Sequence, residues 1–81
     1  MIIKEDIALR DFDFWQGAKA TVKILSNEEL DLLDEILYEI YPYGLEPVEL
    51  NDLFWFDDDF IAELLGYESW DAMYEERKHR L

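Results

Sequence analysis

The chain of 81 residues contains no cysteine, which excludes disulfide bonds and thiolate metal sites. It also lacks any run of about 20 apolar residues, the length that a membrane-spanning helix needs. The first residues have no apolar core of the length found in secretory signals. Together these absences predict a protein of a reducing cytoplasm that does not enter the membrane.

Positive charge is missing from most of the sequence. Between Ile24 and Glu76, 53 residues in all, there is no lysine or arginine but there are 17 aspartates and glutamates. The net charge of −14 exceeds the magnitude of about 2 to 8 that suits the solubility of a small domain. Self-repulsion of this kind lowers stability, and an acidic surface should remain after folding. The composition therefore predicts a positively charged partner.

The residue sets that carry catalysis or bind metals are also missing. His79 is the only histidine, and Ser26 and Ser69 are both expected to cap helices, so no nucleophile with a base can be assembled. The acidic run 57–59 lacks the central glycine of a calcium-binding loop, because Ala62 stands at the sixth position. We therefore predict a protein that is not an enzyme and that has no cofactor and no metal site.

The sequence does contain enough apolar residues to form a folded core, since 51% of its residues are apolar and 16% are aromatic. The few glycines and prolines fall where helices should end. We predict one all-α domain, residues 1–81, folded as a compact bundle of four or five short helices. Residues 1–10 fit neither the helix nor the strand period, so their conformation is left open.

Apolar spacing and capping signals place the helices. Ser26 and Glu29 form a predicted capping box, and the run 54–56 sets three aromatic rings in a row, of which Trp55 is the expected edge residue. The expected helices are 13–25, one that follows Ser26 and is ended by Pro42 and Gly44, 47–56, a fourth that follows 57–59 and ends at Gly66, and a last one that follows Ser69. The expected core residues are Leu30, Leu33, Ile36, Leu37, Ile40, Leu53, Ile61, Leu64 and Leu65.

Carboxylates line the polar face of the second expected helix. Glu28, Asp31, Glu35 and Glu39 follow one another at spacings of three or four residues. Each like-charge pair at that spacing destabilises an isolated helix by about 0.2 to 0.5 kcal/mol, so local stability does not explain the pattern. We expect one continuous acidic face that also includes 43–52 and 57–63. The predicted partner-binding residues are Asp31, Glu35, Glu39, Tyr41, Tyr43, Glu46, Glu49, Asp57, Asp58, Asp59 and Glu63.

The segment 60–70 resembles the helix-turn-helix of bacterial transcription regulators, with Gly66 at the turn. The helix that would read DNA carries Asp71, Glu75 and Glu76, where a DNA-binding protein needs cations against the phosphates. A DNA-binding protein is therefore the third of three hypotheses.

Three sequence blocks, 12–19, 50–56 and 61–67, resemble small acidic proteins encoded on phages and conjugative elements of gut bacteria. The resemblance implies a mobile-element context and assigns no site residues. The chain is also similar in size and charge to the anti-CRISPR and anti-restriction inhibitors that imitate DNA. The first hypothesis is thus a nucleic-acid mimic that occupies the basic groove of a CRISPR nuclease or restriction system. The alternative is an acidic binding module or antitoxin for a basic protein. Either would act as a monomer or small homo-oligomer without binding nucleic acid itself.

Overall fold

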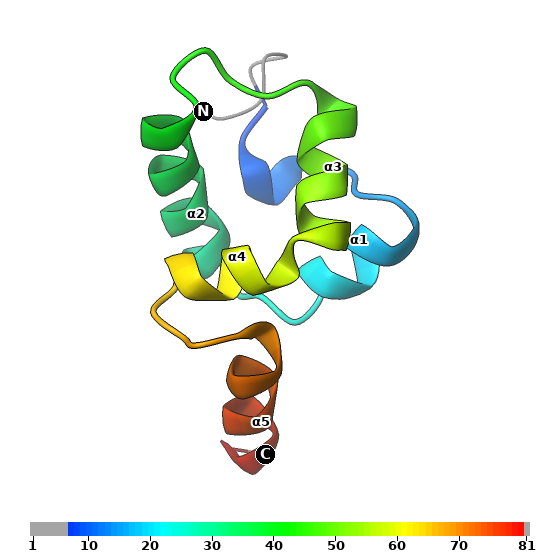
Figure 1. Ribbon diagram of the computed structural model, residues 1–81. Helices are drawn as coiled ribbons and strands as arrows, with labels where there is room; N and C mark the ends of the chain where they lie inside the picture. Colours follow the sequence, from blue (N-terminus) through cyan, green and yellow to red (C-terminus); the bar gives the residue numbers. More distant parts are fainter. Residues whose placement is uncertain (1–6, 81) are drawn as a thin grey trace.

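The computed structural model describes the backbone of residues 7–80 and the side chains of residues 7–78 (Figure 1). Within this part the chain is all-helical, which confirms the predicted fold class. The elements are η1 (Leu9–Asp11), α1 (Gln16–Val22), α2 (Asn27–Ile40), α3 (Pro47–Phe56), α4 (Asp58–Leu64) and α5 (Trp70–Arg80).

Helices α1 to α4 form a compact bundle, and α5 extends from one end of it (Figure 1). Figure 1 shows α2 and α3 on opposite sides, joined by the loop 41–46, with η1 lying between them. Helix α1 packs on α3, α4 packs on both α2 and α3, and α5 packs on α4. Of the segment 1–10 left open by the sequence, residues 9 and 10 belong to the 3-10 turn η1, whereas residues 1–6 lie outside the described part.

The predicted capping signals are present at three helix starts. Ser26 Oγ accepts a hydrogen bond from the Glu29 N–H at 3.1 Å, and the Glu29 carboxylate accepts one from the Ser26 N–H at 3.0 Å. Pro47 is the first residue of α3, where its missing N–H costs nothing. Ser69 Oγ accepts a hydrogen bond from the Ala72 N–H at 3.1 Å. These caps explain why the starts of α2, α3 and α5 were predictable.

Helix α1 is shorter than the predicted 13–25. Trp15 is extended, with φ −130° and ψ 159°, and Gln16 has a positive φ of 52°. The Asn51 side chain holds this conformation, since its Oδ1 accepts from the Trp15 N–H at 3.0 Å and its Nδ2 donates to the Trp15 carbonyl at 3.5 Å. Because Trp15 is bound to α3 in this way, the helix begins only at Gln16.

Among the described residues, the core contains thirteen buried apolar side chains drawn from all the elements. Of the predicted core, Leu30, Leu33, Leu37 and Ile61 are buried, and Ile36, Leu53, Leu64 and Leu65 are partly buried.

The prediction for Ile40 was wrong, because its side chain is 44% exposed. Helix α4 lies near the start of α2 (Figure 1), and η1 contacts Asp31 and Asp34 in its middle. Ile40 ends the helix beyond both of these packing elements.

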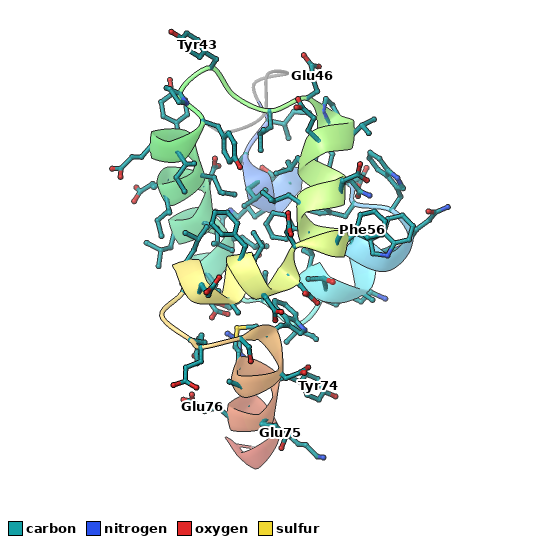
Figure 2. All side chains as sticks on the ribbon, viewed as in Figure 1. Tyr43, Glu46, Phe56, Tyr74, Glu75 and Glu76 are labelled. Atoms are coloured by element: carbon teal, nitrogen blue, oxygen red, sulfur yellow. The ribbon has the colours of Figure 1, made fainter. Side chains whose placement is uncertain are left out.

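The three consecutive rings of α3 have different environments. Phe54 is buried, with its ring centroid 5.0 Å from that of Phe14. Phe56 is 68% exposed (Figure 2) and stacks on Trp55 at 4.6 Å. One ring is thus exposed as expected, but it is Phe56, whereas Trp55 is half-buried against α1.

The indole of Trp55 lies directly on Gly17, so we expect Gly17→Ala to destabilise the domain. A Cβ at position 17 would lie 2.0 Å from Trp55 Nε1, which forces the ring to move. Overpacking of this kind costs about 1 to 3 kcal/mol. Replacing a helical glycine by alanine gains only about 1 kcal/mol in helix propensity. Urea unfolding gives the stability change, and a red shift of tryptophan emission would report the displaced indole.

The control is Ala20→Gly at an exposed position of the same helix, which measures helix propensity alone. A Gly17→Ala variant more stable than the parent protein would contradict this account of the Gly17–Trp55 contact.

Candidate partner-binding surface

The outer face of α2 carries an exposed row of carboxylates. Leu30, Leu33 and Leu37 point into the core, and Glu35 and Glu39 lie on the opposite side of the helix, together with Glu28 and Asp31. Residues four apart on a helix are separated by a rise of about 6 Å. The row therefore presents regularly spaced negative charges to solvent.

Three of the predicted partner-binding residues meet in one shallow hollow on this face. The hollow has a volume of about 470 Å³, and its lining residues are Asp31, Asp34, Glu35, Tyr38 and Glu39. The sequence prediction missed Tyr38, although its place in the helix, three residues after Glu35, was a signal that it lies beside the carboxylates.

The carboxylates of α2 differ in whether they form ion pairs or hydrogen bonds within the protein. Asp31 lies 3.5 Å from Arg10, in an exposed pair of the kind that contributes about 0 to 1 kcal/mol. Asp34 accepts a hydrogen bond from the Leu9 N–H at 3.1 Å. In the described part of the chain, Glu35 and Glu39 form no ion pair and no hydrogen bond through their side chains. Glu28 at the start of α2 is exposed and unpaired in the same way, but of these three carboxylates only Glu35 and Glu39 line the hollow.

Of the α2 carboxylates, that of Glu29 makes both a hydrogen bond and an ion pair within the protein. Its carboxylate accepts from the Ser26 N–H and pairs with the Arg77 guanidinium, which also donates to the Ile24 carbonyl. Both side chains of this pair are largely buried. Two of the arginines, Arg10 and Arg77, are thus engaged with α2 or its leading turn.

A second group of predicted residues lies around the loop between α2 and α3. Tyr43 is 91% exposed and points away from the bundle (Figure 2), next to Gly44 with its positive φ of 79°. Tyr41 is only partly exposed because it packs on the core. The Glu49 carboxylate accepts from the Glu46 N–H at 3.1 Å and so caps α3. Of this group, Tyr43 is the residue most open to contact.

A third group lies at the junction of α3 and α4. Asp57 occupies the N-cap position of α4 but makes no capping bond through its side chain. Asp59 instead accepts a hydrogen bond from the Trp70 N–H at 2.9 Å and so supports the start of α5. Asp58 and Glu63 lie on α4. The predicted residues therefore fall into three groups, and the α2 hollow contains only the first.

Helices α4 and α5 pack on each other across a turn at Gly66, whose φ is 94°. The N-terminal end of α5, where a helix-turn-helix protein meets DNA, carries the Asp59 carboxylate and the exposed Asp71. Carboxylates at a helix N-terminus suit the helix dipole but repel phosphates. This arrangement favours a structural role for the helix pair over DNA reading.

Within residues 7–80, no helix is long and apolar enough to cross a membrane. Among the side chains of residues 7–78, no group of three or more histidines, aspartates or glutamates is placed to hold a metal ion. Comparison with known protein families, curated proteins and solved structures finds no match for this chain.

Proposed function

We propose that this protein imitates nucleic acid and inhibits a nucleic-acid-binding enzyme, such as a CRISPR nuclease or a restriction enzyme, by occupying its basic groove. The observation that carries the proposal is the density of carboxylates along α2. The net charge of −14 and the absence of cations between residues 24 and 76 support it.

The charge spacing of α2 is close to that of a nucleic-acid strand. Its 14 residues include six carboxylates and extend over about 21 Å, which is one charge for about every 3.5 Å. A strand of duplex DNA carries one phosphate for about every 3.4 Å of its axis. Arg10 and Arg77 offset two of the six charges, so the remaining density is lower but of the same order.

The two lysines on the α1 side of the bundle also support a preferred orientation. Lys19 lies on α1 and Lys23 follows it directly, whereas the carboxylate row lies on α2, on the other side of the bundle (Figure 1). A basic groove would attract the α2 side and repel the lysines. Such charge asymmetry steers association and raises its rate.

The test is inhibition of purified CRISPR nucleases and restriction enzymes by the purified protein. Inhibition should be competitive with duplex DNA or guide RNA for the same groove, without any cleavage or modification of the enzyme. If the protein instead binds a basic protein that has no affinity for nucleic acid, the alternative function as an acidic binding module or antitoxin is favoured. Inhibition that added DNA or guide RNA leaves unchanged would reject the mimic.

Salt should act in opposite directions on the free protein and on its complex. Raising NaCl screens the repulsion among carboxylates, so the melting temperature of the isolated protein should rise. The same screening weakens attraction to a basic groove, so the dissociation constant should increase. Thermal unfolding and titration at 50 and 500 mM NaCl, concentrations that differ about threefold in Debye length, measure both effects. A complex insensitive to salt would contradict the electrostatic basis of binding.

A further inference from the structure

Two large apolar side chains interrupt the acidic outer face of α2. Leu32 and Tyr38 are each 47% exposed, although both lie within a helix whose other apolar residues mostly face the core. Leu32 precedes Glu35 by three residues and Tyr38 follows it by three, so the two flank the carboxylate row. Tyr38 also lines the hollow that contains Glu35 and Glu39.

The charge of the molecule limits what can cover this face. With a net charge of −14, another anionic surface, such as nucleic acid or an acidic membrane, would be repelled. The occupant must therefore be cationic. Burying Leu32 contributes about 1.5 to 3 kcal/mol only if the occupant also offers apolar side chains. Tyrosine is likewise enriched in protein interfaces, where its ring is buried and its hydroxyl remains in contact with water.

We infer that the outer face of α2 binds a cationic amphipathic segment of a protein, with arginines on Glu35 and Glu39 and apolar side chains on Leu32 and Tyr38. This inference rests on the proposed function and adds to it the chemistry of the contacted surface. The pair of Arg10 with Asp31 at the margin of the hollow shows the same guanidinium–carboxylate chemistry within the molecule.

The two kinds of side chain have separate roles. Exposed carboxylates raise the association rate and make it depend on salt. Buried apolar contacts slow dissociation, which is where most affinity differences between related complexes arise. Leu32 and Tyr38 therefore determine which basic surface is bound, and Glu35 and Glu39 determine how fast it is found.

The experiment uses three synthetic peptides of equal charge and measures their binding by fluorescence anisotropy. The first is a helix with a row of arginines flanked by leucine and phenylalanine, the second is its scrambled sequence, and the third is oligo-arginine. The helical amphipathic peptide should bind about tenfold or more tightly than the other two, as expected from burial of one or two apolar side chains.

The variants separate the apolar contribution from the charge. Leu32→Ser and Tyr38→Ser should each weaken binding of the amphipathic peptide about tenfold and leave oligo-arginine binding unchanged. Tyr74→Ser is the matched control, because Tyr74 is 48% exposed (Figure 2) but lies on α5. The double variant Glu35→Gln/Glu39→Gln should weaken binding of all three peptides. Circular dichroism checks that each variant is folded.

Equal binding of the three peptides, or equal effects of the Tyr38 and Tyr74 substitutions, would overturn the inference. The peptides contain no nuclease, so this result is independent of the proposed inhibition. Peptide selectivity without nuclease inhibition would reject the proposed function and keep the surface assignment. Nuclease inhibition without peptide selectivity would support the proposed function and reject the surface assignment.

Discussion

Replacing Asn51 by alanine is expected to destabilise the protein by about 2 to 4 kcal/mol. Asn51 is fully buried and satisfies both the N–H and the carbonyl of Trp15. An unsatisfied buried polar group costs about 1 to 3 kcal/mol, and the cavity left by the smaller side chain adds to this. For a domain of this size each kcal/mol lowers the melting temperature by about 4 to 8 °C. The loss should therefore reach at least about 8 °C.

Thermal and urea unfolding of Asn51→Ala measure this loss, and Asn27→Ala is the control. Asn27 is an exposed residue at the start of α2, so its removal should change the melting temperature little. A melting temperature for Asn51→Ala within about 3 °C of the parent, less than 1 kcal/mol, would show that the contact with Trp15 does not hold α1 on α3.

Reversing the charge at Glu35 and Glu39 should produce the largest functional effect. Glu35→Lys/Glu39→Lys changes the net charge from −14 to −10 by placing two cations in the α2 row. Inhibition of the target enzyme should fall by about 100-fold or more, as is usual when charges at the centre of an interface are lost. Thermal stability should stay the same or rise, because like-charge repulsion along α2 is relieved.

The control is Asp13→Lys/Glu68→Lys, which gives the same net charge at two exposed positions in loops outside α2. Dose–response curves for inhibition compare the two double variants. Asp59 is unsuitable for this test, because its carboxylate supports the Trp70 N–H and its reversal would disturb α5. Equal loss of inhibition in both double variants would show that total charge, and not the α2 face, controls binding.

The parts of the fold that the sequence predicted depend on local interactions. The start of α2 follows from Ser26 and Glu29, which are three residues apart, and the start of α3 follows from Pro47. The start of α1 was predicted incorrectly because Asn51 determines it across 36 residues of sequence. Hydrogen-bond partners at such separation leave no periodic signal in a single sequence.

For the candidate surface too, the sequence predicted what depends on local spacing and missed what depends on residues distant in the sequence. Helical spacing correctly placed Asp31, Glu35 and Glu39 on one face of α2. It did not separate available carboxylates from engaged ones, because Arg10 reaches Asp31 only after η1 has packed on α2. The role of Asp59 in supporting α5 was missed for the same reason, since α5 follows eleven residues later.

The carboxylate shared by Ser26 and Arg77 links two helices that lie far apart in the sequence. Glu29 completes the first turn of α2 and also holds α5 through Arg77, 48 residues later. A neutral substitution of Glu29 or of Arg77 leaves the other side chain of the pair with an uncompensated, largely buried charge. In homologous chains, the residues at positions 29 and 77 should consequently covary, and a substitution at only one of them should be rare.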